Sequence, residues 1–63
     1  MKISNNLRRY LERMNALGER CTNTTAEDVR CFHVAKGLGF ISEEWVDSFS
    51  FRLSDKAKAL LAS

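Results

Sequence analysis

The sequence contains no proline, no low-complexity segment and no internal repeat. Its 63 residues are enough for one domain with a small core, so we expect a single domain over residues 1–63. No apolar run is as long as a membrane span, and the amino terminus lacks the apolar core of a signal peptide. The sequence therefore predicts a cytoplasmic protein with no membrane partner.

Residues that bind metals or carry out catalysis are also scarce. The two cysteines, Cys21 and Cys31, and the one histidine, His33, show no CxxC or HxxxH spacing. On a helix, Cys31 and His33 would point about 200° apart, which argues against a shared metal ion and against a Cys–His catalytic pair. A Cys21–Cys31 disulfide is not expected in a reducing compartment. The chain has no phosphate-binding glycine loop and little room for a substrate cleft, so we expect neither an enzyme nor a cofactor.

The net charge is small but unevenly distributed. Ten Lys and Arg stand against eight Asp and Glu, a formal charge of +2. Residues 1–20 are basic, whereas residues 42–53 hold three carboxylates against Arg52. An acidic segment is a poor contact for phosphates, and the same asymmetry would suit head-to-tail self-association.

Helical periodicity predicts a first helix over residues 4–17. Ser4 is a suitable N-cap and Gly18 a suitable C-terminal stop. Arginines occupy the face opposite an apolar stripe, and they form either an ordinary solvated face or an anion-binding surface. The stripe consists of Ile3, Leu7, Tyr10, Leu11, Met14 and Leu17, and the opposite face of Arg8, Arg9, Glu12 and Arg13.

A second helix is predicted over residues 25–37, after a polar loop at 18–24. Thr24 with Glu27, or Thr25 with Asp28, fits the pattern of a capping box. This helix has a broad, mostly apolar arc and a more polar opposite side. The arc holds Asp28, Cys31, Phe32, Val34, Ala35 and Leu38, with Val29 at its rim, and the opposite side holds Ala26, Arg30, His33 and Gly37, flanked by Lys36.

Residues 45–53 carry aromatic and aliphatic side chains at alternate positions, which is the pattern of a half-buried strand. Phe40 and Ile41 supply a short apolar partner, so residues 42–44 would form the loop of a β-hairpin. A competing prediction makes residues 42–50 helical, because their first three residues, Ser-Glu-Glu, are also a good helix start.

Ser54 is a suitable N-cap for a last helix, with Asp55 in the first turn where negative charge is favoured. The predicted fold is therefore mainly α with a small β-hairpin, in the order α-α-β-β-α. If residues 42–50 are helical instead, the alternative is an all-α domain of three or four helices.

The tripeptide Gly-Phe-Ile at residues 39–41, followed by FRLSDKAKALL at residues 51–61, is similar to the tail of many winged-helix transcription regulators. In those proteins Gly-Leu-Ile ends the recognition helix, a wing follows, and the tail closes with aromatic-x-Leu-Thr-x-Lys-Gly-x-x-Leu-Leu. The sequence departs from that pattern at Ala57, where glycine is usual. The resemblance implies a reduced winged-helix fold, with helix 25–37 in the recognition position and one helix fewer than usual before the hairpin.

Two functions fit these features. The first is a small DNA-binding regulatory protein that acts as a homodimer through helix 25–37 and the basic helix 4–17, with an affinity that falls steeply with salt. The expected contacts to duplex DNA are Arg8, Arg9, Arg13, Arg30, His33 and Lys36.

The second function is a protein–protein interaction modulator of a host or phage regulatory protein, with no direct DNA contact. Its expected anchors are Tyr10, Trp45 and Phe49, since buried aromatic side chains dominate many interfaces. The small, proline-free chain with a basic amphipathic start also resembles the early regulatory proteins of lambdoid phages. That resemblance supports both functions equally.

Overall fold

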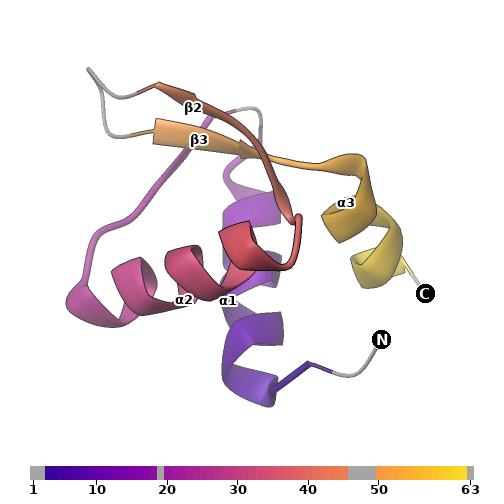
Figure 1. The fold of residues 1–63 in the computed structure, drawn as a ribbon, viewed down its shortest axis with the longest axis horizontal. Helices are drawn as coiled ribbons and strands as arrows, with labels where there is room; N and C mark the ends of the chain where they lie inside the picture. Colours follow the sequence, from indigo (N-terminus) through magenta and orange to yellow (C-terminus); the bar gives the residue numbers. More distant parts are fainter. Residues whose placement is uncertain (1–2, 19, 46–49, 63) are drawn as a thin grey trace.

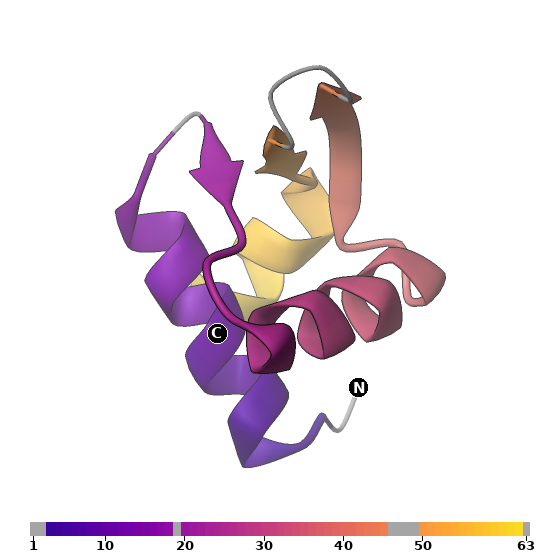
Figure 2. The same cartoon turned by 90° about the vertical axis from the view of Figure 1, so that its left-hand side faces the viewer.

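The computed structural model describes residues 3–18, 20–45 and 50–62. They form three helices and a three-stranded antiparallel sheet, and the helices lie on one side of the sheet (Figures 1 and 2). The predicted fold class, mainly α with a β-hairpin in a winged-helix-like layout, is confirmed. The elements are α1 (Asn5–Ala16), β1 (Cys21–Thr22), α2 (Ala26–Gly37), β2 (Ile41–Trp45), β3 (Ser50–Leu53) and α3 (Asp55–Ala62).

Strand β3 lies in the centre of the sheet, in the order β1-β3-β2. The hairpin registers Ile41 opposite Leu53 and Trp45 opposite Ser50, with an irregularity between Ile41 and Glu43. The predicted loop at residues 42–44 is therefore wrong, because these residues belong to β2. The helical alternative is wrong for the described residues of the segment, which are strand, while residues 46–49 lie outside the described part of the chain.

Strand β1 was not expected, because residues 18–24 read as a polar loop. Two residues are too few to show a period, so no sequence pattern marks this strand. Pairing with β3 sets Cys21 opposite Phe51 and turns the Cys21 side chain into the core. The Cys21 thiol donates a hydrogen bond to the carbonyl oxygen of Met14 at 3.1 Å. This bond joins β1 to the last turn of α1.

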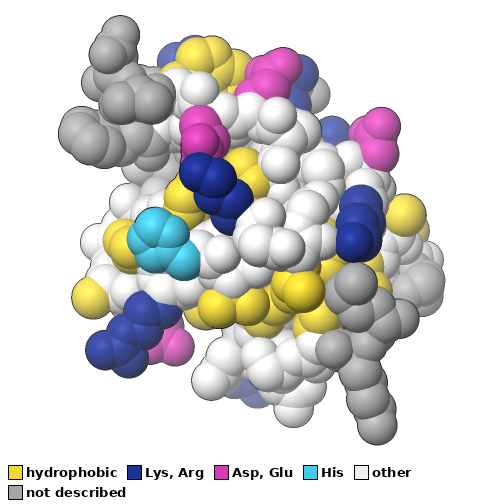
Figure 3. All heavy atoms as spheres, in the orientation of Figure 1, with side chains coloured by type: hydrophobic (Ala, Val, Ile, Leu, Met, Phe, Trp, Pro, Cys, Tyr) yellow, Lys and Arg dark blue, Asp and Glu magenta, His cyan; other side chains and the backbone are white. Residues whose placement is uncertain are grey.

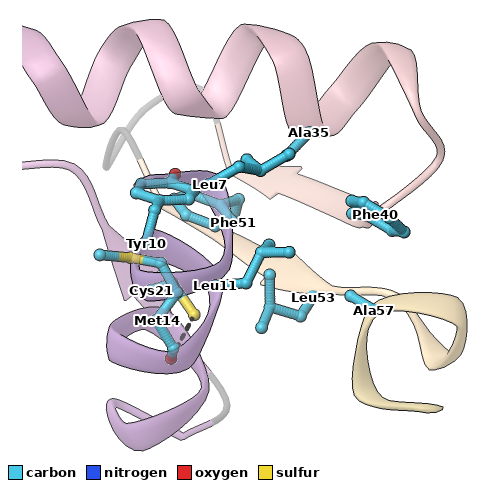
Figure 4. Close-up of a cluster of buried hydrophobic side chains, with 10 residues drawn as sticks. All are labelled: Leu7, Tyr10, Leu11, Met14, Cys21, Ala35, Phe40, Phe51, Leu53 and Ala57. Atoms are coloured by element: carbon cyan, nitrogen blue, oxygen red, sulfur yellow. Dashed lines mark hydrogen bonds between the residues drawn. The ribbon is translucent and has the colours of Figure 1, made fainter. Parts of the chain in front are cut away.

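Side chains from all three helices and all three strands meet in one core (Figure 4). The Phe51 ring lies at its centre, with centroid distances of 6.4 Å to Tyr10 and 4.9 Å to Phe32. Burying aromatic and aliphatic side chains in this way is the main favourable term in folding. The buried apolar residues are Leu7, Tyr10, Leu11, Met14, Cys21, Ala35, Phe40, Phe51, Leu53 and Ala57.

Two residues predicted to face inward are exposed. Leu17 is the C-cap of α1 and is 57% exposed, so the apolar stripe ends at Met14. Val34 is 54% exposed because it lies about 100° around α2 from Ala35, at the edge of the buried arc. The apolar arc of α2 is thus narrower than predicted.

The ends of α2 are fixed by specific contacts. Thr25 caps its start by accepting a backbone hydrogen bond at 3.1 Å, so the structure uses the second of the two predicted caps. The chain reverses at Gly39, whose φ of +83° favours glycine, whereas Gly37 is still helical. Lys56 of α3 donates to the carbonyl oxygen of Leu38 at 2.8 Å, which satisfies an acceptor just past the helix end.

The ends of α1 agree with the prediction. Ser4 is its N-cap and accepts a hydrogen bond from the backbone N–H of Leu7 at 3.2 Å. Gly18 follows the helix with a φ of +90°. Ser54, the predicted cap of the last helix, accepts from the backbone N–H of Ala57 at 3.4 Å.

Candidate functional site

Arg13, one of the six predicted nucleic-acid contacts, has a buried partner. Arg13 donates a hydrogen bond from Nη2 to Oδ1 of Asp28 at 2.7 Å, and Asp28 is only 1% exposed. The other carboxylate oxygen of Asp28 accepts from the backbone N–H and the hydroxyl of Thr24, at 3.1 and 3.0 Å. Hydrogen bonding from Arg13, together with that from Thr24, lowers the pKa of Asp28 to about 2. Arg13 therefore joins α1 to the start of α2.

The outer face of α2 presents the second group of predicted contacts. Arg30 and His33 are exposed, and Arg30 makes no ion pair or hydrogen bond within the residues that the structure describes. Lys36 lies 2.9 Å from Glu44 of β2, an exposed ion pair of the kind worth only about 0–1 kcal/mol. Figure 3 shows His33, in cyan, close to Lys and Arg side chains on this face.

The remaining two predicted contacts lie on α1. Arg8 is half-buried, and Arg9 is exposed on the side of the helix opposite its buried stripe. Figure 2 shows α1 and α2 side by side and crossing at an angle, and the two helices meet where Arg13 pairs with Asp28. The six predicted residues are divided between two helices, and Arg30, His33 and Lys36 share the outer face of α2.

The three predicted protein anchors have different environments. Tyr10 is fully buried, and its hydroxyl donates to Oδ1 of Asn23 at 2.6 Å. Burial raises the pKa of that hydroxyl, and the side chain is inaccessible to a partner in this structure. Trp45 is half-buried at the end of β2. Phe49 lies outside the described residues.

Trp45 is flanked by two arginines. The guanidinium carbon of Arg20 is 4.6 Å from the centroid of the Trp45 ring, and that of Arg52 is 5.7 Å away, both within cation–π range. Arg20 was not among the predicted functional residues, because it lies in a segment that the sequence predicts to be a polar loop. In the structure, the pairing of β1 with β3 brings Arg20 near Trp45. The described glutamates of the predicted acidic hairpin each lie beside a cation, Glu44 at Lys36 and Glu43 at 3.8 Å from Arg52.

A groove of about 440 Å³ lies between α2 and the hairpin. The groove was not predicted, because a chain of this length was expected to have little room for a cleft. Val29, which was predicted to lie at the rim of the apolar arc of helix 25–37, is one of the residues that line it. Hydrophobic side chains are visible beside His33 on this face in Figure 3. The apolar lining residues are Val29, Phe32, Trp45 and Phe51, and the polar ones are Asn23, His33, Glu44 and Ser50.

Within the described ranges, no group of three or more His, Cys, Asp or Glu side chains is placed to hold a metal ion. Cys21 and Cys31 are both free thiols. The helices in the described part of the chain include none that is long and apolar enough to cross a membrane.

Comparisons with known protein families, with curated proteins and with solved structures give no match. The function is therefore proposed from the geometry of this chain alone.

Proposed function

We propose that the protein is a small regulatory protein that binds duplex DNA with the outer face of α2. The observation that carries the proposal is the position of α2. It immediately precedes the β-hairpin in a winged-helix-like layout and presents Arg30 and His33 to solvent. An exposed arginine on such a helix can hold a phosphate or form a bidentate contact with guanine.

Of the six residues predicted from the sequence, we propose the three on α2, Arg30, His33 and Lys36, as the DNA contacts. Arg30 has no competing acidic partner among the described residues, and the exposed Lys36–Glu44 pair can exchange for a phosphate at little cost. Arg13 is excluded from the set because its partner Asp28 is buried. Three side chains can make only a few contacts with phosphates. We therefore propose that two copies bind together as a homodimer, which doubles the number of contacts.

Replacing Arg30 with glutamine is expected to weaken binding to duplex DNA about fivefold to tenfold and to lower the slope of log affinity against log salt by about 1 per protomer. The measurement is fluorescence anisotropy with a labelled duplex across a salt series, with the mass of the protein in solution recorded in parallel. Arg9→Gln is the matched control, because it removes the same charge from an exposed position on α1, outside the face of α2. Equal effects of the two substitutions, or a flat salt response of the unsubstituted protein, would contradict the proposal.

A second candidate function is a modulator of a host or phage regulatory protein that makes no direct contact with DNA. The observation that favours it is the groove between α2 and the hairpin, whose apolar lining has no role in reading phosphates.

A further inference from the structure

Helix α2, which carries the proposed DNA contacts, has little fully buried apolar surface. Only Asp28 and Ala35 of its residues are buried, and Cys31 and Phe32 are partly buried. Helix α1, by contrast, buries four large apolar side chains. Apolar packing is not directional and the side chain of Ala35 is only a methyl group, so hydrogen bonds have a large share in setting the direction of α2.

Both ends of α2 are held by hydrogen bonds from other segments. At its start, Arg13 of α1 donates to one oxygen of the Asp28 carboxylate at 2.7 Å, and Thr24 donates to the other oxygen from its backbone N–H and its hydroxyl. At its far end, Lys56 of α3 donates to the carbonyl oxygen of Leu38 at 2.8 Å, where the two helices lie close together (Figure 1). The Asp28 carboxylate is thus a polar attachment of the start of α2 to α1.

We infer that Asp28 and Arg13 are positioning residues for DNA binding, because their ion pair fixes the direction in which α2 presents Arg30. This inference rests on the proposed function, in which the outer face of α2 contacts DNA. Arg30 lies about 12 Å along the helix from Leu38, so a tilt of about 10° about that held end moves its backbone by roughly 2 Å. A shift of that size breaks a hydrogen bond of ordinary length.

Replacing Asp28 with asparagine separates positioning from net charge, because the two predict effects of opposite sign. The substitution removes a negative charge and releases Arg13 from its partner, so charge alone would strengthen binding to DNA. Asparagine has the shape of aspartate but only one acceptor oxygen, so the hydrogen bonds on one side of the carboxylate are lost. Positioning therefore predicts that Asp28→Asn weakens binding, by about threefold to tenfold.

The measurement is fluorescence anisotropy with a labelled duplex at one low salt concentration, with circular dichroism to show that each variant is folded. The variants are Asp28→Asn, Arg13→Met and the two combined. We expect both single variants to weaken binding although they change the net charge in opposite directions, and the combined variant to bind within about twofold of the weaker single variant. Cys21→Ala is the control for stability, because it removes a buried thiol whose hydrogen bond goes to α1, and it should leave the affinity within about twofold.

Weaker binding by Asp28→Asn and Arg13→Met, without additivity and with Cys21→Ala unchanged, supports the inference. Unchanged or tighter binding by Asp28→Asn would overturn it, as would an equal loss in Cys21→Ala, because reduced stability would then be sufficient. If Asp28→Asn does not fold, Thr24→Val takes its place, because it removes one of the three bonds at an exposed position; about twofold weaker binding is expected, and unchanged binding would overturn the inference. Binding to DNA that depends on Arg30 but not on Asp28 would reject this inference alone, whereas no salt-dependent binding by the unsubstituted protein would reject the proposed function as well.

Discussion

Replacing Phe51 with alanine is expected to unfold the protein. Phe51 is 1% exposed on the central strand, and its ring contacts Tyr10 of α1 and Phe32 of α2. Truncation of a buried phenylalanine costs about 3–5 kcal/mol, because transfer energy is lost and a cavity remains. Folded domains have about 0.05–0.15 kcal/mol of stability per residue, so 63 residues correspond to about 3–9 kcal/mol, and this loss is large enough to remove most of it.

Urea denaturation followed by far-UV circular dichroism measures this effect. The Phe51→Ala protein should show little helical signal or a transition at a much lower urea concentration. Val34→Ala is the control, because Val34 is mostly exposed and its truncation should change the free energy of unfolding by less than about 0.5 kcal/mol. Similar midpoints for the two variants would show that Phe51 is not central to the core.

Replacing Asp28 with alanine is expected to reduce the free energy of unfolding by about 2–3 kcal/mol. The substitution removes the ion pair with Arg13 and both hydrogen bonds from Thr24. Arg13 is 56% exposed and can return to water, so the main cost is the loss of charge-assisted bonds at the start of α2. Chemical denaturation at neutral pH measures it, and a change below about 0.5 kcal/mol would contradict the structural role of Asp28.

The Asp28 carboxylate is also expected to make the free energy of unfolding depend on pH in the acid range. Its pKa falls from an ordinary value of 3.8 to about 2 in the folded state, mainly through the hydrogen bond from Arg13. The folded state therefore binds this proton less tightly than the unfolded state, so the stabilisation is present above about pH 4 and is lost as the pH falls towards 2. Asp28→Asn should lack this part of the pH dependence. Parallel pH profiles of the two proteins would contradict it.

The helices could be predicted from the sequence because their signals are local. The repeat of Leu7, Tyr10, Leu11 and Met14 defines the buried side of α1, and Ser4 and Thr25 supply caps that need only the next turn of chain. The sequence placed Asp28 on the mostly apolar arc of helix 25–37, and the structure buries it. Its ion pair with Arg13 was not predicted, because packing of α1 on α2 brings the two residues together.

The strands were harder to predict because pairing across the sheet determines them. Alternation over 45–53 placed Trp45 and Phe51 on one strand, whereas the structure puts Trp45 at the end of β2, opposite Ser50. The groove and the contact between Arg20 and Trp45 depend on the same pairing. The sequence likewise identified the charged residues of the candidate site, but it could not show which of them form ion pairs. Lys36 pairs with Glu44, for example, only because of the register of the sheet.

The central position of β3 has a consequence for how the chain acquires its structure. The strand that joins both edges of the sheet follows α1 and α2 in the chain, and its partner β1 precedes it by 28 positions, as the pairing of Thr22 with Ser50 shows. A nascent or truncated chain that lacks residues 50–53 has two helices but no surface against which to bury them. Folding of the domain should therefore be cooperative, with no stable subdomain formed by α1 and α2 alone.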